Sequence, residues 1–148
     1  MLRRSVTIGV VTVGMLLCLR GALPADRDSA TIVNSGSTNR PGFRIVVDRS
    51  GTAEFTSVPR RPAAETKPVE LALPQGLAER FYAALKAAKP LSSLPELHCV
   101  KSASFGFVLT VSFDGEETPD LSCGSNSPVM DDLIRDANEI IALFREKG

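Results

Sequence analysis

The segment from Ser104 to Phe113 places a large apolar residue at every second position. These residues are Phe105, Phe107, Leu109, Val111 and Phe113, with smaller side chains between them. Because successive side chains of a β-strand point to opposite faces, this alternation predicts a strand with one buried face and one face toward solvent. Such strands are typical of antiparallel sheets, so we expect the fold to be built around one.

A second segment, Gly42 to Asp48, alternates in the same way, and the pattern around both segments repeats. Each strand is followed by a glycine turn, a weaker return strand and an amphipathic helix that starts near a proline. An isolated hairpin is marginal in water, whereas two such units side by side bury every apolar stripe. The sequence therefore predicts an α+β two-layer sandwich in ββα-ββα order. Its antiparallel sheet has four strands, or five if Thr31–Val33 joins, with both helices on one face.

Both expected helices show apolar residues at helical spacing. The first starts at Pro74, ends before Pro90 and buries Leu77, Phe81, Ala84, Leu85 and Ala88. The second follows Ser127-Pro128, a hydroxyl cap and a first-turn proline, and buries Leu133, Ala137, Ile140, Ile141 and Phe144.

Residues 1–25 have the organisation of a signal peptide. Arg3 and Arg4 precede a run of uncharged residues from Ser5 to Leu19, which is too short to span a bilayer and is stopped by Arg20. An uncleaved anchor is the competing interpretation. We expect export to the periplasm or the extracellular space, and no membrane span after cleavage.

The rest of the chain divides by composition. Residues 26–41 are interpreted as a flexible N-terminal segment and loop, and residues 42–148 as a single α+β domain. Within that domain, residues 58–70 contain three prolines and several charges. We expect them to form an exposed linker, because proline cannot donate to a sheet.

Two of the three cysteines, Cys99 and Cys123, lie outside the signal segment. In an oxidising compartment an even number of thiols predicts a disulfide, which should stabilise the fold by about 3 kcal/mol. The alternative is a reactive or metal-binding pair, but a metal site needs more ligands and His98 is the one histidine. We therefore predict a structural disulfide, no metal site and no cofactor.

Charge argues against a nucleic-acid partner. The chain has 17 basic and 17 acidic side chains, and the signal segment removes three arginines and no acid, which leaves a net charge of about −3. Nucleic-acid binding needs a strongly basic face. Nothing in the sequence matches a glycine-rich phosphate loop either.

The chain has a polar loop from Asn34 to Asn39, which is followed by the segment Gly-Phe-Arg-Ile-Val-Val-Asp-Arg-Ser-Gly-Thr-Ala-Glu-Phe. A helix and a second glycine-turn hairpin come after it. This order of segments resembles small uncharacterised secreted bacterial domains of unknown function. The resemblance covers about residues 31–145. It implies bacterial export and a two-layer fold, and it brings no activity and no site residues.

The face of the sheet away from the helices is the preferred candidate for function. It is expected to carry mostly small side chains and to receive a protein, a peptide or a second copy of the chain. The candidate binding residues are Arg44, Val46, Val108, Thr110 and Ser112 on that face, with Asn34 and Asn39 in the polar loop. The chain is thus interpreted as an exported, non-enzymatic binding or envelope-associated domain that acts through the open face of the sheet or through the loop from Asn34 to Asn39.

Two alternatives stay open. A small secreted hydrolase could be centred on His98, whose side chain has an ordinary pKa near neutrality. The second alternative is a structural envelope protein or a protease inhibitor. In an inhibitor, the proline-rich segment would be the part that a protease could engage.

Overall fold

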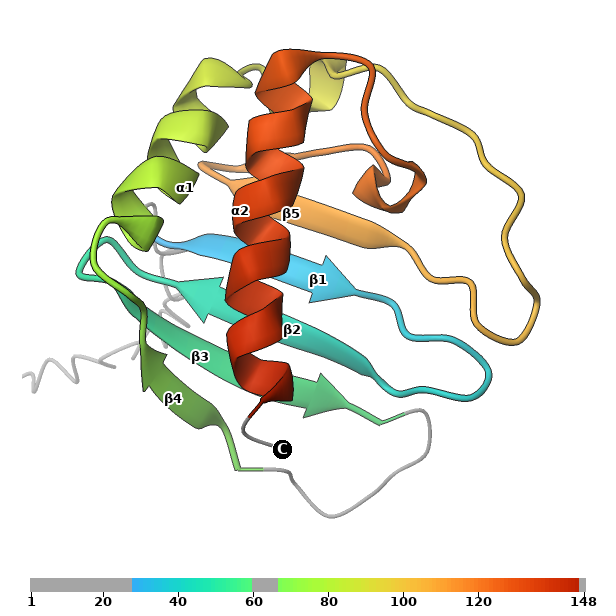
Figure 1. Cartoon of the computed structure of the whole chain (residues 1–148), viewed down its shortest axis with the longest axis horizontal. Coiled ribbons are helices and arrows are strands. Elements are labelled where there is room, and N and C mark those ends of the chain that lie inside the picture. The colour runs from blue at the N-terminus through green and yellow to red at the C-terminus, as the bar shows by residue number, and fades with distance from the viewer. Residues whose placement is uncertain (1–27, 60–66, 147–148) are drawn as a thin grey trace, which may run out of the picture.

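The computed structural model describes residues 28–59 and 67–146 (Figure 1). Its strands are β1 (Ala30–Asn34), β2 (Gly42–Val47), β3 (Thr52–Val58), β4 (Val69–Ala72), β5 (Leu109–Phe113) and β6 (Glu116–Glu117). Its helices are α1 (Leu77–Ala87) and α2 (Pro128–Arg145), with short 3-10 turns at η1 (Leu91–Ser93) and η2 (Leu121–Cys123). The predicted signal segment, residues 1–25, lies outside the described residues. The predicted α+β class, with an antiparallel sheet and two helices, is confirmed.

The described strands form one antiparallel sheet in the order β4-β3-β2-β1-β5-β6. The sequence predicts four strands or five, with the two ββα units paired directly, and both points differ from the structure. The sheet has six described strands, and β1 separates the units by pairing with β2 on one side and β5 on the other. Ile32 of β1 lies opposite both Ile45 and Val111 and is fully buried. Ile32 is the one large apolar residue on the buried face of this short strand, which does not reveal a central position from sequence.

The strand predicted from Ser104 begins only at Leu109. The backbone N–H of Gly106 donates to the Ser102 carbonyl at 2.7 Å, so the chain turns instead of extending. A Cβ on Gly106 would lie 2.6 Å from that carbonyl oxygen, which shows that the turn needs glycine there. Phe105 and Phe107 therefore leave the sheet.

The limits of the domain also differ from those expected. The sheet begins at Ala30, inside the segment interpreted as flexible, and not at residue 42. Val58 ends β3 and Val69 starts β4, so the predicted linker 58–70 contributes to two strands at its ends. Pro68 directly precedes β4, and an edge strand tolerates a proline at that point. Residues 60–66 lie outside the described residues.

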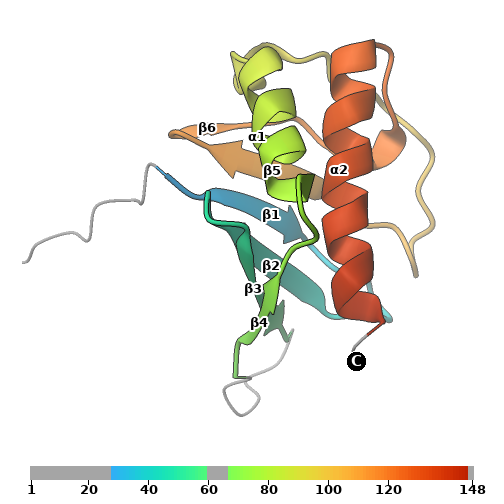
Figure 2. The ribbon, with the colours of Figure 1, turned by 60° about the vertical axis from the view of Figure 1, so that its left-hand side comes forward.

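Both helices lie side by side on the same side of the sheet (Figure 2). The predicted apolar stripes of both helices are buried against it. The start of α2 is confirmed, because the Ser127 hydroxyl accepts a bond from the Met130 N–H and Pro128 occupies the first turn. Helix α1 starts at Leu77, three residues after the predicted Pro74, and Gly76 precedes it with a φ of 80°. Neither helix in the described part of the chain is both long and apolar enough to cross a bilayer.

Candidate binding site

A pocket of about 610 Å³ lies at the end of the sheet where β1 passes into β2, next to the last turns of α2. It is lined by Asn34, Gly36, Ser37, Arg40, Pro41, Gly42, Phe43, Phe55, Ser57, Phe105, Phe107, Ile141, Phe144 and Arg145, and we call it the phenylalanine pocket. Its lining comes from separate stretches of the chain around residues 34–43, 55–57, 105–107 and 141–145. Five of the seven phenylalanines of the chain lie in it.

Three of the phenylalanine rings form a continuous stack. Phe55 of β3 lies between Phe43 of β2 and Phe144 of α2, with ring centroids 5.4 Å apart on both sides and interplanar angles of 30° and 27°. Cross-strand pairing of Ile45 with Phe55 fixes this arrangement, because it puts Phe43 diagonal to Phe55 on the helix-facing side. The stack offers an apolar surface against which a ligand can pack.

The turn between β1 and β2 is held by close backbone contacts. Gly36 has a φ of 69°, and a Cβ there would lie 2.4 Å from the Gly42 nitrogen. The Asn34 side chain accepts a hydrogen bond from the Gly36 N–H at 2.8 Å. Ser37 and Arg40 exchange two backbone hydrogen bonds, at 2.9 and 3.3 Å. These contacts place the Ser37 hydroxyl and the Arg40 side chain on one tight turn.

The segment that carries Phe105 and Phe107 is joined to this turn along its length. Ser35 donates its N–H to the Val108 carbonyl and accepts the Val108 N–H with its hydroxyl, both at 2.9 Å. The Thr38 hydroxyl donates to the Ala103 carbonyl at 3.0 Å, and the Asn39 N–H donates to the Ser104 carbonyl at 3.3 Å. The two segments therefore form one wall of the pocket.

A polar cluster behind this wall fixes its position. The Phe107 carbonyl accepts from Lys101 Nζ at 2.7 Å and from the Ser122 hydroxyl at 3.0 Å. Asp120 pairs with Lys101 and accepts the backbone N–H groups of Leu109 and Ser122 at 3.1 and 2.9 Å. Partial burial raises the pKa of Asp120, but the bonds from Lys101, Ser122 and Leu109 outweigh it and bring the pKa to about 2.

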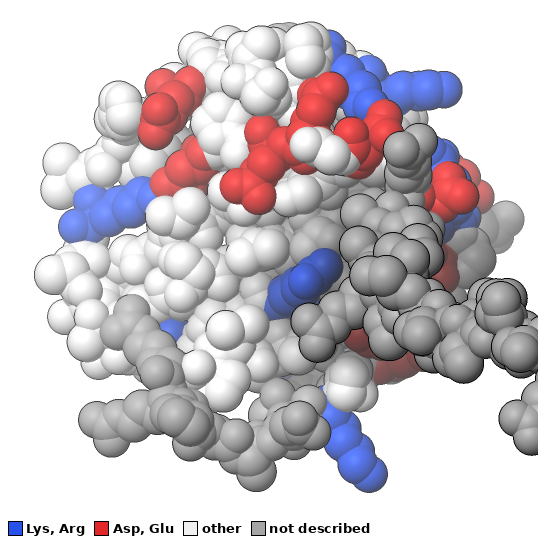
Figure 3. Space-filling model, turned by 180° about the vertical axis from the view of Figure 1, so that it is seen from behind, with Lys and Arg blue, Asp and Glu red and all other residues white. Residues whose placement is uncertain are grey.

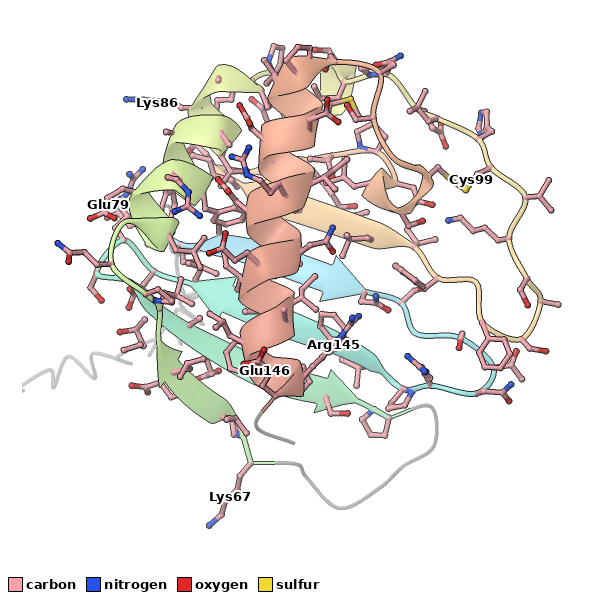
Figure 4. The ribbon with its side chains drawn as sticks, in the orientation of Figure 1. Lys67, Glu79, Lys86, Cys99, Arg145 and Glu146 are labelled. Atoms are coloured by element: carbon pink, nitrogen blue, oxygen red, sulfur yellow. A yellow bond between two sulfur atoms is a disulfide. The ribbon has the colours of Figure 1, made fainter. Side chains whose placement is uncertain are left out.

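The two cysteines tie the same segment to η2. The Cys99 and Cys123 sulfur atoms lie 2.08 Å apart and the Cα atoms 5.4 Å apart, so the pair stands at disulfide distance, as the sequence predicts. Figure 4 shows Cys99 on the long connection between α1 and β5. The bridge lies two residues before Lys101, and it adds a covalent attachment next to the polar cluster.

Three polar side chains of the pocket have no partner among the described residues. The Ser37 hydroxyl is buried, with 4% of the residue exposed, and it forms no hydrogen bond. Arg40 and Arg145 are exposed, and neither forms an ion pair with a described residue. Figure 4 shows Arg145 in the last turn of α2, over the sheet. Since both arginines line the pocket and are exposed, they lie at its mouth.

The predicted sheet-face residues do share one face, opposite the helices. Arg44, Val46, Thr110 and Ser112 point there by strand alternation. The register adds two residues of β1 that the sequence does not suggest: Val33 lies between Arg44 and Thr110, and Thr31 lies between Val46 and Ser112. Figure 3 shows this side, where charged side chains leave large areas free and acidic groups gather in the upper part. Val108 is exposed but lies outside β5.

The polar-loop residues separate in the structure. Asn34 lines the phenylalanine pocket, whereas Asn39 lies exposed on the turn beside Ser104. His98 is exposed, and no described side chain hydrogen-bonds to it or forms an ion pair with it. Among the described residues, no group of three or more His, Cys, Asp and Glu side chains could hold a metal ion.

Sequence reasoning misses most of the pocket. Phe105 and Phe107 fit a strand pattern, Arg145 fits the favourable end of a helix, and Ser37 and Arg40 fit an ordinary polar loop. The one available signal is Gly106 between the two phenylalanines, since glycine inside a strand pattern suggests a break or a close backbone approach.

Comparisons with protein-family models, with curated proteins and with solved structures found no match. The resemblance to secreted bacterial domains therefore stays a prediction.

Proposed function

We propose that this chain is an exported binding domain that holds a small, largely apolar molecule in the phenylalanine pocket. One observation carries the proposal: five phenylalanines from separate segments surround a pocket of about 610 Å³ that also contains unpartnered polar groups. Small-molecule sites are concave, of roughly 300–1,000 Å³, mostly apolar and equipped with a few placed polar groups. The pocket meets each of these conditions.

The exposed side chain of Phe105 supports the same proposal. It is 60% exposed although it lies at the pocket, and it belongs to a wall held by a disulfide and by the Lys101–Asp120 pair. An exposed aromatic ring loses contact with water when a ligand packs against it, which is favourable by about 25 cal/mol per Å² of apolar surface. A fixed wall also limits the entropy that binding removes.

The chemistry of the lining favours binding over catalysis. The pocket presents phenylalanine, serine, asparagine and arginine side chains, and His98 is not among its lining residues. A serine nucleophile needs a neighbouring base for activation. We therefore place the proposed function in molecular recognition, and we retain periplasmic or extracellular location as part of the proposal, supported by the leader-like residues 1–25 and by the paired cysteines.

The test is a fluorescence titration of the purified protein with N-phenyl-1-naphthylamine, an uncharged apolar probe. We expect saturable enhancement of its emission. Phe105→Ala should weaken binding by about three- to tenfold, because it removes an exposed ring from the pocket wall. Val100→Ala is the matched control, since Val100 is fully exposed on the same connection and does not line the pocket.

Absence of saturable binding would refute the proposed function. Equal affinities of the Phe105→Ala protein and the wild type would also contradict it, because the probe would then occupy another surface. A fall in affinity on charging Val46 or Thr110, with Phe105→Ala unaffected, would instead favour the open face of the sheet.

A further inference from the structure

We infer that the ligand is an amphiphile with an oxyanion head group, bound by Arg40 and Arg145 at the mouth of the phenylalanine pocket and by the buried Ser37 of its lining. The inference rests on the proposed function, since it names the class of molecule that the same pocket takes. It adds the charge of the ligand, which the apolar lining of the pocket does not determine.

The arginines of the described residues fall into two groups. Arg49, Arg80 and Arg135 form ion pairs with acidic side chains, and Arg80 and Arg135 both contact the buried Asp136. Arg40 and Arg145 form no ion pair with a described residue although both line one pocket. Arg44, on the open face of the sheet, also has none, and it serves below as a control.

Two arginines that line one apolar cavity, with no ion pair to a described residue, are suited to a carboxylate or a phosphate. A guanidinium presents several N–H donors in a planar fork that matches the oxygens of either anion. Arg40 comes from the β1–β2 turn and Arg145 from the last turn of α2, so an anion at the mouth of the pocket can contact both elements. The apolar body of the ligand then points toward the stack of Phe43, Phe55 and Phe144.

The buried hydroxyl of Ser37 is an independent observation that points to the same ligand. A buried polar group without a hydrogen bond destabilises the folded protein, so native structures rarely retain one. Ser37 lines the pocket, its hydroxyl is buried and unpartnered among the described residues, and it lies on the turn whose backbone bonds also fix Arg40. A ligand oxygen next to Arg40 would accept the hydrogen bond that Ser37 lacks.

The experiment compares decanoate, decyl phosphate and decanol as competitors of N-phenyl-1-naphthylamine, each below its micelle concentration. The three share one alkyl chain and differ in head group. In the wild type we expect at least one of the anions to compete about tenfold more strongly than decanol, since hydrogen bonds between charged groups are stronger than those to a neutral hydroxyl. The stronger of the two anions identifies the head group. The difference in affinity between the anion and decanol should shrink as the salt concentration is raised, because salt screens charges at the exposed mouth of the pocket.

The variants separate charge from packing. Arg40→Gln with Arg145→Gln should remove most of the advantage of the anion over decanol, and comparing the two competitors within one variant cancels any change in apolar binding. Ser37→Ala should lower anion affinity by about three- to tenfold, without loss of thermal stability. Arg44→Gln, which removes an arginine that lies outside the pocket, should leave all affinities as they are.

Equal competition by decanol and both anions in a protein that binds the neutral probe would overturn this inference and leave the proposed function standing. An advantage that survives in the double arginine variant would overturn it as well. Failure of the neutral probe to bind would instead refute the proposed function on which the inference rests.

Discussion

Asp120 shows how a single side chain holds the pocket wall. Its carboxylate joins Lys101 to the backbone of Leu109 and Ser122, and Lys101 and Ser122 both bind the carbonyl of Phe107. Removing the charge of Asp120 would leave several donors without an acceptor. In the sequence, Asp120 is one of four acidic residues between Asp114 and Asp120, a pattern that fits a solvated turn. Its role cannot be read from that pattern, because its partners are brought together by folding and not by spacing.

The lowered pKa of Asp120 predicts acid sensitivity. Its pKa is about 2 in the folded protein against an ordinary value of 3.8, so ionised Asp120 stabilises the fold above about pH 4. That contribution, about 2 kcal/mol, is lost as the pH falls from about 4 to about 2. Urea unfolding at several pH values should show this loss in the wild type and a smaller one in Asp120→Asn.

Glu96→Gln is the matched control for this prediction, because Glu96 is an exposed carboxylate on the connection that carries Lys101 and forms no ion pair with a described residue. It should keep the acid dependence of the wild type. The same acid dependence in Asp120→Asn as in the wild type would show that Asp120 is not its source.

At the scale of elements, the sequence predicts the turns and helices, which depend on local patterns. It misses the strand order, which depends on pairing between distant segments. The hairpin turn at Gly51 and the Asp114-Gly115 turn are confirmed by their positive φ angles, and so are the buried stripes of both helices. Each depends on a few neighbouring residues. The central position of β1 depends on distant partners, since Ile32 pairs with Ile45, 13 residues away, and with Val111, 79 residues away.

The connection between α1 and β5 is the element where a strand pattern misleads. Phe105 and Phe107 continue the alternation of β5, yet the turn at Gly106 removes them from the sheet and places them at the pocket. The alternating pattern thus correctly predicts Leu109, Val111 and Phe113 as buried strand residues. It fails where a hydrogen-bonded turn and the contact with Ser35 replace sheet pairing.

The disulfide should stabilise both the fold and this connection. Replacing Cys99 and Cys123 together by serine should lower the free energy of unfolding by about 3 kcal/mol, since the bridge closes a loop across a sequence separation of 24. Urea unfolding of the variant and the wild type measures the difference. Affinity for the neutral probe should also fall, because Phe105 would lose part of its fixed position. An unchanged free energy of unfolding would contradict a stabilising role for the bridge.

At the scale of the whole molecule, the pocket exists because the topology brings four stretches of the chain to one end of the sheet. The β1–β2 turn, the end of β3, the Phe105–Phe107 segment and the last turn of α2 meet there. No local pattern relates these stretches, so the sequence predicts the sheet face and the polar loop as candidates. Among the lining residues it finds those of the loop from Asn34 to Asn39, of which only Asn34 is named as a binding residue. The position of the site follows from β1 at the centre and α2 lying across the sheet (Figure 1).

An NMR titration of the labelled protein with decanoate tests the position of the site most directly. We expect saturable chemical-shift changes concentrated at the residues of the phenylalanine pocket, with Ser37, Arg40, Phe55, Phe105 and Arg145 among the largest. The open face of the sheet should remain unperturbed at Arg44, Val46, Thr110 and Ser112. Changes concentrated on that face, or no saturable change anywhere, would contradict the assignment of the pocket as the binding site.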